Sequence, residues 1–402
     1  MKTFITIFIL ICLQLKLSGQ IPSEKIVIGE KIIISSKILN EDRQILVHLP
    51  QDYEYSDNKF PVLYVLDGEF FFYQAIGAVQ FLSECSYIYN NPIPEMIIVA
   101  VVNVDRNRDY TPTYAPNQLG SLYYPTSGKA DRFLEFIEKE LIPEIDIRYR
   151  TQPFRTLAGW SFGGLFTVHT LINNPELFSA YLAISPSIWW DDDLYVSKFD
   201  SIFAQYKFIP KKLTITCGTL EGGSIGRSVR DGFVPILKKK LPNDYQFNFV
   251  EIPDEGHSFV PYKALYDGLA SVFSDYPMPF EKVNEGYESI EKYFSELSKR
   301  YDYEIKISEW AYMNLINDLN GKGKHKKAMD IANLYHIDYP HSAWAILFIG
   351  STFEYMGNYE KAKENYKQSI KIEKSKPVPD SERIISFTIR LNLLNEKLKD
   401  NE

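Results

Sequence analysis

Residues 154–173 read FRTLAGWSFGGLFTVHTLIN, and this stretch decides the fold. Its first part is a short apolar run of the kind that forms buried strands, whereas the part from Leu165 onward is typical of a buried helix. Between them lies GWSFGG, residues 159–164. A strand that turns abruptly into a helix strains its backbone, and small residues beside the turn relieve the crowding. The stretch therefore predicts a strand, a sharp turn at Ser161 and a helix, with the Ser161 hydroxyl at the N-terminus of that helix.

Similar apolar runs lie on both sides of this turn. The runs are PVLYVLDG, MIIVAVVN, AYLAISPS, KLTITCGT and YQFNFVEIP, and most of them lack the polar alternation of a half-exposed strand. That pattern is typical of strands buried on both faces of a parallel sheet that helices cover. Helices are accordingly predicted over 70–86, 129–142, 162–173, 228–240 and 261–274.

An antiparallel hairpin is predicted before the first of these runs. Segments 31–37 and 43–49 are β-branched and flank the turn-like sequence Asn40-Glu41-Asp42. The hairpin and the alternating strands and helices together predict an α/β sandwich with a mostly parallel central sheet.

Past about residue 281 the sequence becomes helical and rich in Glu and Lys, and it contains a repeat. Gly323 and Ala328 have counterparts at Gly357 and Ala362, an offset of 34 residues that matches the tetratricopeptide period. We interpret these small residues as places where paired helices approach closely. Two such units rarely stand alone, so they are expected to lean on the first domain or on a third helical pair built from 283–300 and 381–397.

The length of 402 residues fits more than one hydrophobic core. We expect a signal peptide over 1–19, an α/β domain over 20–280 and an all-α, tetratricopeptide-like domain over 281–402. The net charge of -8, without a long Lys/Arg run, argues against binding to nucleic acid or to anionic membranes. A small-molecule partner is favoured, and no sequence motif for a metal or a cofactor is present.

The first twenty residues have the layout of a signal peptide: Lys2 precedes a mostly apolar run from Phe4 to Leu13, and small residues follow it. A retained transmembrane helix is the alternative, but the run is short for the about 20 residues that a span needs. Large residues precede Cys12, which disfavours lipidation there. The mature chain is thus expected in the periplasm or outside the cell. Its Cys85 and Cys217 lie in apolar contexts that favour buried thiols over a disulfide.

A serine hydroxyl needs a positioned base, which predicts a histidine late in the chain. Among the six histidines only His257, in PDEGHSF, lies just after the last predicted strand, at the edge of the sheet where the turn at Ser161 also lies. The carboxylate that orients its ring is expected after the preceding strand, and Glu221 lies there. The rival carboxylates are Asp191, Asp192, Asp193 and Asp254.

Attack on a carbonyl produces an oxyanion, which two backbone N–H groups can stabilise. Phe162, directly after the serine, is predicted to supply one of them. The other is expected from Gly68 or Glu69, in the turn after VLYVLDG.

The chain resembles the esterase D-like family of α/β-hydrolases, which includes siderophore trilactone esterases. The resemblance covers roughly residues 25–275 and is carried by VLYVLDGE, RNRDYTPT, FLEFIEKELIPEID, YRTQPFRTLAGWSFGGLF, ISPSIWW and EGHSF. It implies an α/β-hydrolase sandwich with Ser161 and His257 as the catalytic pair, and leaves the acid more open because the family varies there. Trp160 departs from many relatives, which carry His, and is expected to change the shape of the pocket.

Residues 104–128 form a long predicted loop, and such loops often carry function. We expect its arginines and a later pair of tryptophans to line the pocket, since guanidinium groups and indoles can hold an anionic, aromatic substrate. The alternative is structural: Arg108 bridges Asp109 or a helix end, and one tryptophan is plain core. The predicted substrate-binding residues are Arg106, Arg108, Trp160, Trp189 and Trp190.

The sequence thus predicts a secreted or periplasmic serine carboxylic ester hydrolase that forms an acyl-serine intermediate. A siderophore (catecholate trilactone) esterase is the next assignment, and acyl or feruloyl esters of polysaccharides are a third. A different class also stays open, in which the helical repeats recruit a protein partner and the first domain is a scaffold.

Overall fold

The computed structural model describes residues 26–51, 53–84, 91–118, 122–203, 211–243, 245–376 and 379–399. The predicted signal peptide, Cys12 and Cys85 lie outside these residues. Within them, no helix combines the length and the apolar character needed to cross a bilayer.

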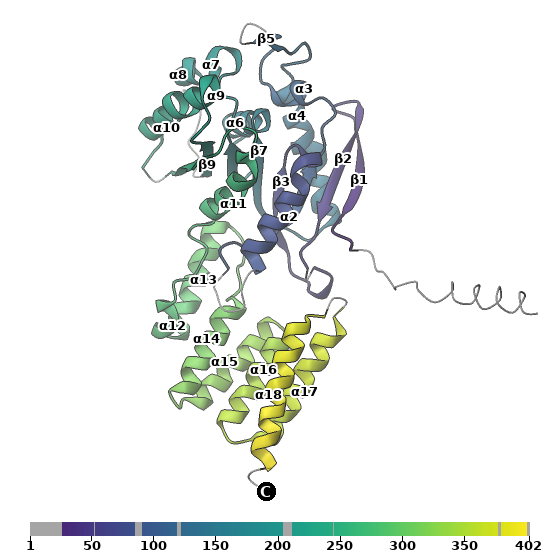
Figure 1. The fold of residues 1–402 in the computed structure, drawn as a ribbon, viewed down its shortest axis with the longest axis vertical. Coiled ribbons are helices and arrows are strands. Elements are labelled where there is room, and N and C mark those ends of the chain that lie inside the picture. Colours follow the sequence, from purple (N-terminus) through teal and green to yellow (C-terminus); the bar gives the residue numbers. More distant parts are fainter. Residues whose placement is uncertain are drawn as a thin grey trace, which may run out of the picture.

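An eight-stranded sheet organises the N-terminal part of the chain (Figure 1). The strand order is β1-β2-β4-β3-β7-β8-β9-β10. All neighbours from β4 to β10 run parallel, whereas β1, β2 and β4 pair antiparallel. The predicted hairpin and the mostly parallel sheet are therefore confirmed. The strands are β1 (Glu30–Ser36), β2 (Glu41–His48), β3 (Phe60–Val65), β4 (Ile97–Val101), β7 (Thr151–Trp160), β8 (Ala180–Ile184), β9 (Lys212–Gly218) and β10 (Gln246–Ile252).

Helices cover both faces of this sheet, which explains why every residue of β3, β4, β8 and β9 is buried. On one face lie α2 (Gly68–Glu84) and α11 (Val260–Val272). On the other face lie α6 (Phe162–Asn173) and two long helices, each with a central π-turn. The two long helices are α4–η2–α5 (Ala130–Arg148) and α9–η3–α10 (Gly223–Lys240). The five predicted helices are thus present, two of them longer than expected.

Several short elements were not predicted. The loop 104–128 contains α3 (Arg106–Tyr110) and a small hairpin of β5 (Asn117–Gln118) and β6 (Leu122–Tyr123). The helices α7 (Trp190–Ser197) and α8 (Phe199–Phe203) follow β8, and η1 (Tyr53–Tyr55) precedes β3. Elements this short show no hydrophobic periodicity, so the sequence pattern could not reveal them.

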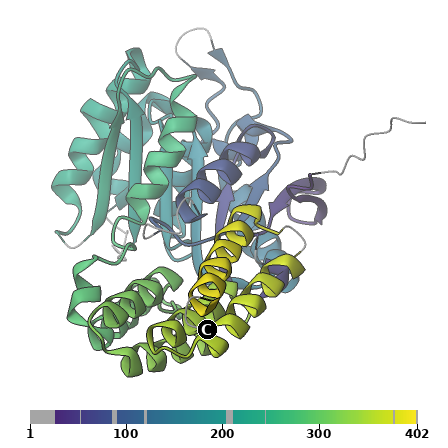
Figure 2. The same cartoon turned by 60° about the horizontal axis from the view of Figure 1, so that its bottom comes forward.

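The C-terminal part is all-helical, as predicted. Its helices are α12 (Glu281–Glu285), α13 (Tyr287–Tyr301), α14 (Glu309–Gly321), α15 (His325–Asp338), α16 (Ala343–Tyr355), α17 (Tyr359–Ser375) and α18 (Ser381–Lys399). They form an arc that curves beneath the sheet domain (Figure 2). The boundary at 280/281 and the tetratricopeptide assignment stay predictions.

The glycines of the repeat have a different role from the one expected. Gly323 and Gly357 lie in the turns after α14 and α16, with φ of +72° and +74°, and a Cβ at either would meet no atom within 4 Å. They permit left-handed turns rather than close helix packing. Close packing is instead seen at the fully buried Ala328 and Ala362 and at Gly350, where a Cβ would lie 2.8 Å from the Tyr366 ring.

The expected third helical pair is wrong. Helix α13 lies next to the sheet domain, whereas α18 packs on α17 at the far end of the arc (Figure 1). The other expectation, that the helical region leans on the first domain, is confirmed by a shared apolar core. One cluster of buried side chains continues from α2 and α11 through Phe294 and Tyr301 to Phe348 in α16.

A buried lysine joins the two parts. Lys212, the first residue of β9, donates to Asp275 Oδ1 at 2.6 Å and to the Tyr301 hydroxyl at 2.8 Å. The Tyr301 ring also packs against Phe154, with centroids 4.9 Å apart, and against Phe273 at 5.9 Å. A single tyrosine of α13 therefore contacts β7, β9 and the segment after α11.

We predict that Tyr301→Ala lowers the free energy of unfolding by about 3–5 kcal/mol, because it removes a buried ring and leaves Lys212 short of an acceptor. Chemical denaturation of the full chain measures this loss. Tyr262→Ala, at a side chain 60% exposed on α11, is the matched control and should change stability by less than about 0.5 kcal/mol. Equal losses in both variants would contradict the junction described above.

Candidate active site

Ser161 lies at the sharp turn between β7 and α6, as predicted. Its backbone is strained, with φ of 59° and ψ of -115°. The flanking glycines make the turn possible: a Cβ at Gly159 would lie 2.3 Å from the Gly163 carbonyl oxygen. The turn therefore depends on glycine at 159 for steric reasons, and it presents the Ser161 side chain at the carboxyl end of the sheet.

His257 and Glu221 lie together at this same edge. Glu221 follows β9 and His257 follows β10, both parallel to β7. The Nδ1 atom of His257 is 2.8 Å from Glu221 Oε2, and this bond leaves Nε2 as the proton acceptor. The His257 ring lies 5.0 Å from the ring of Trp160, the residue before the nucleophile candidate. The three side chains named from the sequence thus lie at the carboxyl ends of β7, β9 and β10. The structure joins Glu221 and His257 by a hydrogen bond, whereas the Ser161 hydroxyl is bonded to Ser187.

The rival carboxylates have other contacts. Asp193 bonds Arg227 and Ser228, and the backbone of Asp191 bonds Gln118. Asp254 is exposed, and its backbone N–H bonds Thr219. Of the candidate carboxylates in the described part of the chain, Glu221 is the one that contacts His257.

The Glu221 carboxylate is almost fully buried, and hydrogen bonds hold it in its charged form. Burial would raise its pKa, but bonds from His257, from Ser185 Oγ at 2.5 Å and from the Gly218 N–H at 2.7 Å lower that pKa below its usual 4.5. A charged acid behind the imidazole is what stabilises an imidazolium during proton transfer.

Two serines in the turn after β8 were missed by the sequence analysis. Ser185 bonds Glu221, and Ser187 Oγ lies 3.2 Å from Ser161 Oγ. Both lie in the quoted motif ISPSIWW, but their partners are distant in the chain. Such contacts leave no local pattern that sequence reasoning could detect.

The predicted oxyanion donors lie at two helix N-termini. Phe162 begins α6 and Gly68 begins α2, so their N–H groups have no acceptor within their own helices. A Cβ at Gly68 would be 2.8 Å from the Ala100 backbone, which is why this position suits glycine. The Glu69 carboxylate accepts from the Asn103 N–H at 3.2 Å and thereby fastens the start of α2 to the turn after β4.

Arg106 joins two turns at the carboxyl edge of the sheet. It donates to both oxygens of Asp67, at 2.6 and 3.0 Å, and to the Trp160 carbonyl at 3.0 Å. Burial alone would lower the pKa of the guanidinium, but the bonds and the charge of Asp67 raise it above its ordinary value. Arg106 therefore ties the turn after β3 to the backbone of the turn at Ser161.

Arg108 makes contacts within the protein, as in the alternative in which its role is structural. It donates to both oxygens of Glu41, at 2.6 and 2.9 Å, and to Asp109 at 2.7 Å. Asp109 in turn bonds the buried Arg43 at 2.8 Å. The network fastens α3 to β2.

The two tryptophans after the Ser185–Ser187 turn are buried, with exposed fractions of 7% and 0% for Trp189 and Trp190. Both pack against the Phe162 ring, at 5.8 and 5.4 Å, and Trp190 Nε1 donates to Thr113 Oγ1 at 3.0 Å. They form the wall behind the first residue of α6, and Trp190 fixes the loop 104–128 to it.

Cys217 is a free, buried thiol at the end of β9. Burial raises its pKa to about 12, so it is not a thiolate at neutral pH. In the described ranges, no three His, Cys, Asp or Glu side chains are grouped so that they could hold a metal ion.

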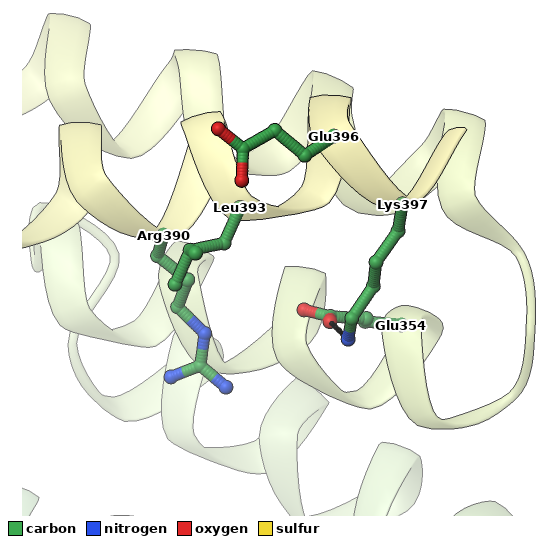
Figure 3. Close-up of a pocket in the computed structure, with 5 residues that line it drawn as sticks. All are labelled: Glu354, Arg390, Leu393, Glu396 and Lys397. Atoms are coloured by element: carbon green, nitrogen blue, oxygen red, sulfur yellow. Dashed lines mark hydrogen bonds and ion pairs between the residues drawn. The ribbon is translucent and has the colours of Figure 1, made fainter. Parts of the chain in front are cut away.

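A pocket of about 340 Å³ lies in the C-terminal helices, lined by Glu354, Arg390, Leu393, Glu396 and Lys397, and a Glu354–Lys397 ion pair crosses it (Figure 3).

The sheet, the turn at Ser161 and the Glu221–His257 pair define an α/β-hydrolase fold. The chain belongs to the family described as "Putative esterase", whose model matches residues 36–212. A crystal structure of an IroE-like serine hydrolase from Shewanella oneidensis is 30% identical, covering 77% of this chain and 99% of that one with a TM-score of 0.65.

Two further comparisons extend this result. Ferri-bacillibactin esterase BesA of Bacillus subtilis is 31% identical over 180 residues, which are 40% of this chain and 60% of that protein. The chain therefore matches less than two thirds of this curated relative. A structure of an uncharacterised protein from Capnocytophaga ochracea is 16% identical with a TM-score of 0.56, and covers 92% of this chain and 99% of that one. That likeness concerns the fold, and it includes most of the helical region.

The lowered pKa of Glu221 predicts a pH-dependent contribution to stability. Because the folded state holds fewer protons than the unfolded state, the contribution is present above pH 4.5 and is lost as pH falls through the lowered value. Glu221→Gln lacks this titration. We expect the difference in unfolding free energy between wild type and variant to be largest at neutral pH and to shrink below pH 4.5. Urea denaturation across this range measures it, and a constant difference would contradict the assignment.

Proposed function

We propose that this protein is a carboxylic ester hydrolase that works through an acyl-serine intermediate on Ser161. The observation that carries the proposal is the Glu221–His257 pair, at 2.8 Å, on the sheet edge where the strained turn presents Ser161. Membership of the esterase family and the likeness to a serine hydrolase support it.

The proposed reaction uses the groups described above. His257 Nε2 takes the Ser161 proton as the Oγ attacks the ester carbonyl, and Glu221 balances the imidazolium that forms. The Phe162 N–H and the N–H of Gly68 or Glu69 stabilise the oxyanion. The imidazolium then protonates the leaving alcohol, and a water molecule activated by His257 releases the acid and restores Ser161.

For the substrate, a siderophore ester is the more specific proposal. It is supported by the relative that is named a ferri-bacillibactin esterase. The aromatic surroundings of Ser161, with the Trp160 and Phe162 rings 5.8 and 5.5 Å from the Arg106 guanidinium, suit a substrate with aromatic acyl groups. We also propose secretion to the periplasm or the exterior, on the basis of the N-terminal sequence alone.

We predict that Ser161→Ala and His257→Ala each lower kcat on p-nitrophenyl butyrate by about 10³-fold or more, because the nucleophile or its base is lost. Steady-state kinetics of the full mature chain measure this effect. His169→Ala, at the buried histidine of α6 that bonds Tyr195 and Asp131, is the control for the loss of an imidazole. Background rates in the wild type and both variants would favour the alternative in which the helical repeats bind a partner and this domain is a scaffold.

We further predict that a ferric catecholate trilactone is hydrolysed with a higher kcat/KM than simple p-nitrophenyl or feruloyl esters, because its aromatic groups gain contacts that small acyl chains lack. Product analysis by liquid chromatography over a substrate panel tests this. A preference for feruloyl esters would reject the siderophore assignment and leave ester hydrolysis in place.

A further inference from the structure

We propose that the turn Ser185-Pro186-Ser187 after β8 is a positioning element for the site, in which Ser187 orients the Ser161 hydroxyl while Ser185 fixes the Glu221 carboxylate. We call these three residues the serine turn. The proposal rests on the proposed ester hydrolysis through Ser161 and adds two residues to its machinery. It starts from the position of the turn, which touches the nucleophile and the acid from a single loop.

Ser187 contacts the nucleophile twice. Its Oγ lies 3.2 Å from Ser161 Oγ, and its N–H donates to the Ser161 carbonyl oxygen at 3.0 Å. Ser187 is 1% exposed, so water does not compete for its hydroxyl. When Ser187 donates to Ser161 Oγ, the hydrogen of Ser161 is left to point elsewhere, and His257 is the base at this edge. The same donor stays bonded to the oxygen while Ser161 passes its proton to His257, and Ser187 itself neither gains nor loses a proton.

Ser185 contacts the acid. Its Oγ donates to Glu221 Oε1 at 2.5 Å, and the other carboxylate oxygen, Oε2, accepts from His257. Together with the Gly218 N–H, Ser185 fixes the rotation of the carboxylate about its side-chain axis. Ser185 therefore determines the direction from which Oε2 meets the imidazole, although it does not touch the ring.

The backbone conformation of Ser185 indicates that a hydroxyl group is needed at this position. It is a fully buried non-glycine residue with φ of +40°, a region that favours glycine. Backbone strain of this kind is concentrated at functional sites, where surrounding contacts enforce it. Here the Ser185 N–H is bonded to the Thr216 carbonyl oxygen at 2.8 Å, in the neighbouring strand β9. Glycine would relieve the strain but would remove the hydroxyl that Glu221 accepts.

The serine turn is held against the nucleophile by close packing. The Ser161 N–H donates to the Ile184 carbonyl oxygen at 3.0 Å. A Cβ at Gly164, in the first turn of α6, would lie 2.9 Å from both the Ile184 carbonyl oxygen and Pro186 Cα. Glycine is thus needed at position 164 so that the serine turn can approach α6. It is not needed there for the sharp turn at Ser161. This second set of contacts shows that the distance between Ser187 and Ser161 is fixed by the backbone.

The test uses the full chain and the variants Ser187→Ala, Ser185→Ala and Ser185→Gly, with Ser161→Ala as the reference for a lost nucleophile. Ser228→Ala is the matched control, because Ser228 is also buried and also bonds a carboxylate, that of Asp193, outside the site. Two rates are measured for each variant: labelling by a fluorophosphonate probe, which reports activation of the serine whatever the natural substrate, and turnover of p-nitrophenyl butyrate as kcat and KM across pH. Thermal unfolding checks the fold.

We expect Ser187→Ala to lower the labelling rate and kcat by about 10-fold or more at unchanged KM, the size expected for a lost bond to a reacting oxygen. We expect Ser185→Ala to move the acid limb of the pH profile to higher pH, because the Glu221–His257 pair holds its proton more strongly once the carboxylate has lost one of its donors. Ser185→Gly should show the same shift with a higher unfolding temperature than Ser185→Ala. Ser228→Ala should match the wild type.

Wild-type rates and an unchanged pH profile in Ser187→Ala and Ser185→Ala would overturn the proposal, provided that Ser161→Ala is inactive. If Ser161→Ala were labelled and active like the wild type, the proposed function would fail instead. A variant at 187 that unfolds early is replaced by Ser187→Cys, which has a similar shape and a weaker donor. Reduced kcat in that folded variant supports the role of Ser187, and wild-type kcat in it contradicts that role.

Discussion

The candidate site depends on one constraint: the ends of parallel strands must bring distant residues to one edge of the sheet. The bond between His257 Nδ1 and Glu221 Oε2 joins residues 36 positions apart, and it forms because β9 and β10 are parallel neighbours with matching register. Ser161 follows β7, which β8 separates from β9. An antiparallel connection would send one of these residues to the opposite edge. The right order of strands is thus what places the acid, the base and the nucleophile together.

Backbone strain is concentrated along this edge. Asp67, Ser161 and Ser185 follow β3, β7 and β8, and all three are non-glycine residues with positive φ, of 56°, 59° and 40°. Each is held by bonds to a neighbouring segment: Asp67 by Arg106, Ser161 by the Ile184 carbonyl, and Ser185 by the Thr216 carbonyl. Strain that recurs at adjacent strand ends, and that is enforced by contacts across the sheet, indicates an edge shaped for chemistry rather than for stability alone.

The sequence predicted those features of the fold and site that have a local signal. Fully apolar runs predicted the buried strands, and the GWSFGG motif predicted the turn at Ser161, because the crowding between Gly159 and Gly163 acts between near neighbours in the chain. Position after a strand favoured Glu221 and His257, but the rival aspartates follow strands too, and it is the bond from His257 to Glu221 that distinguishes them. Ser185, Ser187 and the role of Arg106 could not be predicted, since each is defined by a partner 26 to 39 residues away. The Gly323 and Gly357 repeat was seen, but its cause, a left-handed turn, requires φ values that a sequence does not contain.

The helical region is bound to the sheet domain by the same face that carries α2 and α11. Helix α2 begins at Gly68, a predicted oxyanion donor, and α11 begins at Val260, shortly after His257. The positions of both helices therefore affect the site. The apolar cluster that packs them on the sheet continues without a break into α13, α14 and α16. Lys212, at the start of the strand that ends before Glu221, bonds Tyr301 of α13. Packing of the C-terminal helices therefore restrains the strand and the two helices that frame the site, and the helical region is physically part of the scaffold that holds Glu221 and His257.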